Sequence, residues 1–370
     1  MKHAVHVVRC PDYETALPEA FERLAAASGL FDTAALCGKR VLVKPNLLTD
    51  RLPEQAVTTH PSLVRLVIRR LKAAGAIVSV GDSPASTANL KVTLERSGIG
   101  AACEEEGVPF VSFEQGGVRN FEQDGFSFLL AKPVVEADLL VNLPKVKSHS
   151  LTKLTAAVKN LYGAVPGYSK TTLHRLYPKP ETFGRLLQAI WNVLPPAVSL
   201  ADAVVGMEGQ GPSNGKPVWL GFLAASDDPF ALDTALCGIL HLRPSTVPYL
   251  KGCETAHAPE VLGDDVSVPS FEIPSGSHLL DLLPAWLVHV ASRLLWVRPA
   301  FVPGPCVRCG KCAQACPASA LALRADASVP RLDAKACIGC ACCHEVCPKG
   351  AIRMKQSAVL RLIGAFKGLD

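Results

Sequence analysis

Apolar residues in the first 240 positions recur in two alternating patterns. Short, strongly apolar runs at 4–8, 40–43, 76–80 and 137–142 are bounded by polar or turn-forming residues and predict β-strands. Between them lie longer segments in which apolar positions recur every three or four residues. The clearest, Pro61–Ala73, begins with a proline at its first helical position. Strands that alternate with amphipathic helices predict an α/β domain with a mostly parallel sheet.

The same patterns predict further helices at 89–98, 151–161, 182–194 and 231–242, and further strands at 108–113, 198–202 and 219–224. Residues 244–277 are rich in Pro, Gly and Ser and are expected to be irregular. Residues 278–297 are amphipathic, with a narrow polar arc. We interpret this segment as a helix that connects two domains; the alternative is a helix that lies in a membrane interface.

The chain ends with a cysteine spacing that occurs twice. Cys-x2-Cys-x2-Cys-x3-Cys-Pro begins at Cys306 and again, 31 residues later, at Cys337. This is the bacterial ferredoxin spacing for [4Fe–4S] clusters, in which the fourth cysteine binds the other cluster. The spacing therefore predicts two clusters. Their ligands are Cys306, Cys309, Cys312 and Cys347 for one, and Cys337, Cys340, Cys343 and Cys316 for the other.

Other uses of these cysteines fit the spacing less well. Structural zinc sites take four ligands in two pairs, not triplets followed by Cys-Pro. Disulfides need an oxidising compartment. An additional thiol, Cys342, lies 30 residues after Cys312, whereas Cys343 keeps the 31-residue repeat. We therefore interpret Cys342 as a thiol that binds no cluster.

Length and composition indicate more than a small ferredoxin. The 370 residues divide into an expected α/β domain at 1–245, a linker with the connecting helix at 246–298, and a small α+β domain resembling bacterial ferredoxins at 299–370. The last region holds ten Lys or Arg and four Asp or Glu, so its net charge is +6. The whole chain has a net charge of +5. This excess of positive charge largely offsets the negative charge of the predicted clusters. The sequence contains no nucleic-acid-binding motif that would give the basic residues another role.

Location and partners are expected to follow from the same features. The chain shows neither an N-terminal apolar segment of signal-peptide length nor an apolar run long enough to span a membrane. Iron–sulfur clusters and free thiols fit the reducing cytoplasm. Peripheral contact with a membrane through residues 278–297 is the alternative described above. A redox protein and a small anionic ligand are the expected partners.

Polar side chains follow several of the predicted strands in the large domain. In open α/β sheets, ligands bind beyond the carboxyl ends of the strands. Lysines there suit a carboxylate or phosphate, and imidazoles suit proton transfer. We expect His60, His149 and Asp82 to be catalytic. The residues expected to bind the substrate are Lys44, Asn46, Thr59, Lys145, Lys147, Lys159 and Asn160.

Each of these residues also has an ordinary structural interpretation. A single lysine is usually solvated, Asp82 could hold a turn, and His60 could cap the helix that begins at Pro61. The recurrence of polar residues at several strand ends favours a site. Asp202 and the glycine-rich loop 206–212 form a further candidate, although the loop lacks the phosphate-binding motifs GxGxxG and Gly-Lys-Ser/Thr.

Four short motifs carry a resemblance to a known family. They are Lys44-Pro45-Asn46, Thr59-His60-Pro61, Gly81-Asp82-Ser83-Pro84 and Pro144-Lys145-Val146-Lys147 followed by His149. In this order they resemble the domain of unknown function 362, whose members often carry a two-cluster ferredoxin module at the C-terminus. The resemblance covers about residues 1–240 and 300–355 and implies an iron–sulfur protein without supplying a reaction. The lysines and histidines around the expected site also give this chain a more remote similarity to nickel-dependent lactate racemase.

Three functions are compatible with the sequence. The first is a ferredoxin-type oxidoreductase that passes single electrons to an anionic substrate or cofactor in the α/β domain. The second is a non-catalytic electron carrier or adaptor that docks on a redox partner. The third is an isomerase-like enzyme with structural clusters. The size of the α/β domain and its polar strand ends favour the first.

Overall fold

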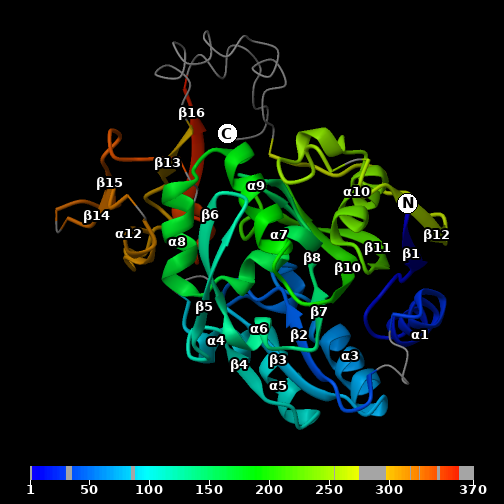
Figure 1. Ribbon diagram of the computed structural model, residues 1–370. Coiled ribbons are helices and arrows are strands. Elements are labelled where there is room, and N and C mark those ends of the chain that lie inside the picture. The colour runs from blue at the N-terminus through cyan, green and yellow to red at the C-terminus, as the bar shows by residue number, and fades with distance from the viewer. Residues whose placement is uncertain are drawn as a thin grey trace.

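A single large sheet organises the first two thirds of the chain (Figure 1). The computed structural model describes residues 2–30, 36–84, 88–253, 255–274, 297–316, 318–324, 326–339 and 342–357. Residues 278–296 of the expected helix at 278–297 and the expected cluster ligand Cys340 lie outside these ranges. In spatial order the strands are β12 (Pro259–Gly263), β1 (His3–Arg9), β11 (Lys216–Ser226), β10 (Ala197–Glu208), β7 (Leu139–Leu143), β2 (Arg40–Pro45), β3 (Ile77–Asp82) and β4 (Phe110–Ser112).

The sheet is mostly parallel, as the sequence predicts. Strands β10, β7, β2, β3 and β4 run parallel to one another. The antiparallel pairs β10–β11 and β11–β1 extend the sheet on the other side, and β12 forms the edge by pairing in parallel with β1. A branch leaves β10, where β8 (Lys145–His149) pairs in parallel and then turns back antiparallel into β9 (Lys153–Thr155).

Helices cover both faces of the sheet and give the domain three layers (Figure 1). One hydrophobic core lies between the sheet and α1 (Leu17–Ser28), α3 (Pro61–Ala73) and α5 (Ile99–Glu105). The other lies beneath α7 (Ala157–Leu161), α9 (Pro180–Trp191) and α10 (Pro229–Ile239). Because both faces are covered, adjacent residues of β2 such as Val41 and Leu42 are buried in opposite cores.

Two predictions along this domain are wrong. The helix predicted at 151–161 begins only at Ala157, because Lys153–Thr155 pairs with β8 instead. Leu151 and Leu154 are both buried in the core, so their spacing suited a helix equally well. The stretch expected to be irregular contains β12, which gains regular structure by pairing with β1 at the sheet edge.

Several elements had no sequence prediction. They include α1, α5, the hairpin of β5 (Val118–Gln123) and β6 (Phe126–Ala131), α6 (Lys132–Val135) and α8 (Gly167–Leu176). The large domain also contains the helices α4 (Leu90–Ser97), η1 (Pro53–Gln55), η2 (Tyr162–Ala164) and η3 (Pro244–Thr246). Helix α8 matters most, because it contributes one wall of the pocket described below.

The cysteine-rich module folds as two similar halves. It contains the strand pairs β13 (Val297–Phe301)–β16 (Ile352–Gln356) and β14 (Leu321–Ala322)–β15 (Arg331–Leu332), with short helices α12 (Lys311–Gln314) and α13 (Cys342–Glu345). Positive φ angles recur 31 residues apart, at Arg308 and Gly339 and at Ser319 and Gly350. The cysteine repeat is therefore also a repeat of backbone conformation.

Candidate functional site

The order of the strands defines where a ligand would bind. From β2 the chain builds β3 and β4 on one side, and then returns to place β7 and β10 on the other. Lys44 at the end of β2 lies opposite Asn142 at the end of β7. A crevice forms where neighbouring parallel strands lead away in opposite directions, and ligands in α/β proteins bind there. A pocket with a cavity volume of about 110 Å³ opens at this point.

Four lysines and one carboxylate line the pocket, namely Lys44, Lys147, Lys159, Lys170 and Asp82. Lys44 Nζ lies 2.8 Å from Asp82 Oδ1, and both side chains are buried. Burial lowers the pKa of Lys44, and the neighbouring Asp82 carboxylate opposes that shift. Because lysines outnumber the carboxylate, the pocket is suited to an anion.

A chain of side-chain amides fixes Lys147. Its Nζ donates to Asn46 Oδ1 at 2.6 Å and to the Val57 carbonyl at 2.7 Å. Asn46 in turn donates to Asn160 Oδ1, and Asn160 donates to Asn142 Oδ1. These bonds join the strand ends to α7, so the lysine is held by the fold itself.

His149 presents a defined tautomer to the pocket. Its Nδ1 accepts backbone N–H groups from Leu151 at 3.0 Å and Thr152 at 3.3 Å. Burial, and then the nearby cations beginning with Lys159, hold the pKa of His149 well below its usual value. The imidazole is therefore neutral near pH 7, with its proton on Nε2. In this state it can donate one hydrogen bond to a ligand.

Helix α8 adds two residues that sequence reasoning missed. Burial lowers the pKa of Lys170 to about 8 and the pKa of His174 to about 3. Lys170 Nζ donates to the Ser83 carbonyl. Within the described part of the chain, the buried His174 Nδ1 and Thr155 Oγ1 have no hydrogen-bond partner, and both residues line the pocket. The i, i+4 spacing of Lys170 and His174 on one helix face was the available signal.

A glycine allows the Lys44–Asp82 pair to lie against the backbone. A Cβ added to Gly163, in η2, would contact both Lys44 Nζ and Asp82 Oδ1 too closely. No side chain therefore fits at this position without moving the pair. The sequence gives no indication of this requirement.

Three residues expected in the site lie outside the pocket lining. Lys145 Nζ is 2.9 Å from Asp202 Oδ2 and 2.7 Å from the Tyr13 hydroxyl. The register between β8 and β10 shifts between Lys145 and Lys147, so the two lysines do not share one environment as a regular strand would require. Lys147 therefore lines the pocket, whereas Lys145 does not.

The other two expected residues hold the start of α3. His60 Nδ1 accepts the Ser62 N–H, which makes His60 the helix cap. Its ring stacks on Tyr13 with centroids 3.7 Å apart, and burial lowers the pKa of His60 to about 4. Thr59 donates to the Leu143 carbonyl. In the loop 206–212, Pro212 lines the pocket, whereas Asp202 belongs with Lys145.

The cysteines gather in two smaller pockets of the terminal module. One is lined by Cys306, Cys309, Cys312 and Cys347, and the other by Cys316, Cys337 and Cys343. Cys316 Sγ accepts the Ala320 N–H and Cys347 Sγ accepts the Ala351 N–H, each at 3.2 Å. Grouped thiols with backbone N–H donors to sulfur fit iron–sulfur clusters.

The cysteine module also forms a wall of the lysine pocket. Ala315, Cys342 and Val346 line that pocket together with the four lysines. Arg51 donates to the Cys347 carbonyl at 3.3 Å, and Asn214 donates to the His344 carbonyl at 2.9 Å. Figure 1 shows the module beside α8, the helix that carries Lys170. The pocket is thus completed by both parts of the chain.

An α/β domain joined to a ferredoxin-like module defines the class of the molecule as an iron–sulfur protein. A 4Fe-4S dicluster domain matches residues 301–354. Residues 41–238 match the family described as Domain of unknown function (DUF362), and the chain belongs to this family. The family resemblance drawn from the four motifs is therefore confirmed.

The chain is similar to a curated protein and to two solved structures. A curated relative, "Thylakoid-associated protein sll1697" of Synechocystis, is 32% identical over 312 residues, which is 80% of this chain and 97% of the relative. Two solved structures are more distant. The lactate racemase apoprotein from Thermoanaerobacterium thermosaccharolyticum is 15% identical with a TM-score of 0.44, over 66% of this chain and 57% of that one. A Thermotoga maritima protein is 12% identical with a TM-score of 0.39, over 70% and 62%.

Among the residues that the structure describes, no helix combines the length and apolar character needed to cross a membrane.

Proposed function

We propose that the chain is a ferredoxin-type oxidoreductase that acts on an anionic substrate or cofactor bound in the lysine pocket. Two [4Fe–4S] clusters, when bound, would supply single electrons there. Cys306, Cys309, Cys312 and Cys347 would hold one cluster. Cys316, Cys337, Cys340 and Cys343 would hold the other. The grouping of seven of these cysteines in two pockets supports the ligand sets.

The single observation that carries the proposal is the shared pocket. Two of its lining residues, Ala315 and Cys342, immediately precede Cys316 and Cys343, which are proposed ligands of the same cluster. A ligand held by the lysines would therefore lie against the cluster module. A docking surface for a separate protein would not require a lysine-lined cavity of this kind.

The chain's own residues would bind the ligand and move protons. Lys44, Lys147 and Lys170 would neutralise carboxylate or phosphate oxygens. His149 would donate its Nε2 proton to an oxygen of the ligand. Lys170, with a pKa of about 8, could release or accept a proton near neutral pH. His60, outside the pocket, takes no part in this proposal.

The expected location and partners remain part of the proposal. Free thiols and iron–sulfur chemistry favour the cytoplasm, and a redox protein would supply or remove electrons. The relative's name, which places that protein at thylakoids, supports a peripheral contact with a membrane.

The test begins with anaerobic purification, iron and sulfide analysis, and mass spectrometry of released small molecules. We expect about eight irons per chain, four for each cubane cluster, and an anionic ligand. The reduced protein should be reoxidised by that ligand or its oxidised form. Lys170→Met should slow this reoxidation at least tenfold, whereas Lys91→Met, at an exposed position of α4, should not.

The remaining functions make different predictions for the same preparation. Eight irons with no released ligand, and reoxidation by no small molecule, would indicate an electron carrier. Turnover that is the same with oxidised and reduced clusters would indicate an isomerase-like enzyme. Either result would contradict the oxidoreductase proposal.

Cys342 provides a separate check on the ligand sets. It lines the lysine pocket, whereas Cys343 lines a cysteine pocket. Cys342→Ser should therefore retain the full iron content, and Cys343→Ser should lose up to half of it. Equal losses in the two variants, measured by iron analysis, would show that the assignment within this pair is wrong.

A further inference from the structure

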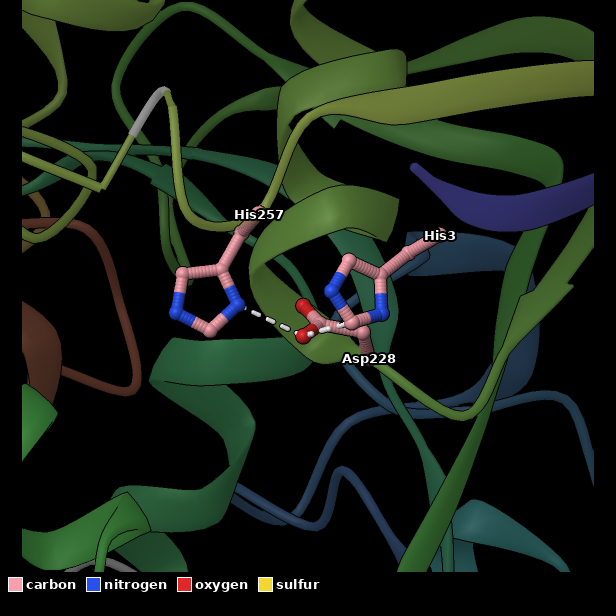
Figure 2. Close-up of side chains that lie close together, drawn as sticks. All are labelled: His3, Asp228 and His257. Atoms are coloured by element: carbon pink, nitrogen blue, oxygen red, sulfur yellow. Dashed lines mark hydrogen bonds and ion pairs between the residues drawn. The ribbon is translucent and has the colours of Figure 1, made fainter. Parts of the chain in front are cut away.

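Three side chains of types that can bind metals converge at a corner of the sheet, away from the residues that line the lysine pocket. Figure 2 shows His3 and His257 approaching Asp228 from two sides. His3 belongs to β1, Asp228 immediately precedes α10, and His257 lies in the turn before β12. Three segments far apart in the sequence are thus brought to one point, which the proposed function does not use.

The distances suit a small metal ion. His257 Nδ1 lies 2.6 Å and His3 Nδ1 lies 3.6 Å from the same oxygen, Asp228 Oδ2. One ligand atom from each of the three residues lies within 4.8 Å of the other two. Ligands around a tetrahedral ion at 2.0–2.1 Å are separated by about 3.4 Å. The two separations lie on either side of that value. The shorter one is a hydrogen bond between His257 and Asp228, which an ion would replace after small side-chain rotations.

The backbone around each ligand is already fixed. Asp228 Oδ1 accepts the Ala231 N–H at 2.8 Å, which caps α10 and leaves Oδ2 directed at the imidazoles. His3 N donates to the Ala258 carbonyl, next to His257. The His257 ring packs on Phe230 with centroids 4.7 Å apart. The carboxylate and the two rings are therefore positioned by the fold before any ion binds.

We propose that His3, Asp228 and His257 bind a divalent first-row transition-metal ion of the zinc type. Two imidazole nitrogens and one carboxylate oxygen form a ligand set that such ions prefer, with one position left for water. The exposed fractions of the side chains, 33% for His3, 26% for His257 and 9% for Asp228, give the ion access from solvent. The ion would fasten β1 and the turn before β12 to the start of α10.

Zinc binding to the full-length, cluster-loaded chain tests the proposal. The protein should carry no polyhistidine tag and be dialysed anaerobically against Zn²⁺ at micromolar concentration. We expect one zinc per chain by mass spectrometry of the metals, with no loss of iron. Zinc should also raise the melting temperature. His257→Ala and His3→Ala should each weaken binding at least tenfold and abolish that rise.

The control and the contrary results are equally specific. His6 lies on the same strand as His3 but is not one of the clustered ligands, so His6→Ala should bind zinc like the original chain. His257→Gln, which keeps a side chain against Phe230, guards against misfolding. No zinc uptake, or uptake unaffected by the His3 and His257 substitutions, would overturn the proposal. Iron content is followed in the same samples, so failure here is distinguishable from failure of the proposed function.

Discussion

Two buried lysine–aspartate pairs occupy similar positions at the sheet and differ in what surrounds them. Lys44–Asp82 has an N–O distance of 2.8 Å and Lys145–Asp202 one of 2.9 Å, and all four side chains are buried. Burial lowers the pKa of both lysines, and the aspartate opposes the shift in each case. The chemistry of the pair alone therefore does not distinguish a binding group from a structural one.

The neighbours make the distinction. The Asp202 carboxylate accepts hydrogen bonds from Lys145, the Tyr13 hydroxyl and the His60 N–H, so it is enclosed by the protein. Lys44 and Asp82 line the pocket, next to η2 and α8. We therefore expect the Lys145–Asp202 pair to maintain the fold and the Lys44–Asp82 pair to contact the ligand.

The largest expected effect is on stability, from Asp202→Ala. The substitution leaves the buried Lys145 without its counter-ion, which costs about 3–5 kcal/mol in comparable buried pairs. The midpoint of anaerobic urea unfolding, followed by circular dichroism, should fall accordingly. Binding of sulfate, used as a probe anion, should change little in the folded fraction.

An exposed pair provides the matched control. Asp138 pairs with Arg40 at the protein surface, so Asp138→Ala should scarcely move the unfolding midpoint. If Asp202→Ala instead left stability intact and abolished sulfate binding, the contrast between the two pairs would be wrong.

The next effect concerns the pocket pair and is produced without altering either charge. Gly163→Ala places a Cβ against Lys44 Nζ and Asp82 Oδ1. We expect overpacking to cost about 1–3 kcal/mol of stability, together with weaker sulfate binding measured by calorimetry. Gly238→Ala is the control, because a Cβ at that position in α10 meets no atom within 4 Å. Equal behaviour of the two variants would count against a tight contact at Gly163.

The smallest effect is a pH dependence that sharpens the role of the pocket. Lys170 is a cation below its pKa of about 8 and neutral above it. Sulfate affinity should therefore fall as pH rises, by about tenfold between pH 7 and pH 9. Sulfate keeps its charge over this range, so the change reports the protein. Lys170→Met should flatten the profile, and an unchanged profile would assign the dependence to another group.

The fold could be predicted from sequence where the signal is local. The apolar face of Pro61–Ala73 matches α3, and the parallel sheet follows from alternating elements. The ferredoxin-like module is equally local, since its eight predicted ligands lie within 306–347. The short elements β9 and β12 could not be predicted, because their conformation depends on pairing with β8 and β1.

The candidate site was predictable only in part, for the same reason. Lys44 and Asp82 stand at the ends of β2 and β3, Lys147 lies within β8, and the sheet brings the three together. Lys145 follows the same rule but is diverted by a register shift that no sequence pattern revealed. Lys170 and Gly163 enter the site through α8 and η2, whose places are set by packing against the core.

The wall contributed by Ala315, Cys342 and Val346 has a consequence for how the protein matures in the cell. The cysteine module has a small hydrophobic core that includes the cysteines themselves, and metal binding commonly drives the folding of such modules. We expect chains made during iron shortage to have a folded α/β domain and an incomplete pocket. Assembly of the complete pocket would then depend on the supply of iron. A chelator should release an anion bound in the pocket before the large domain unfolds.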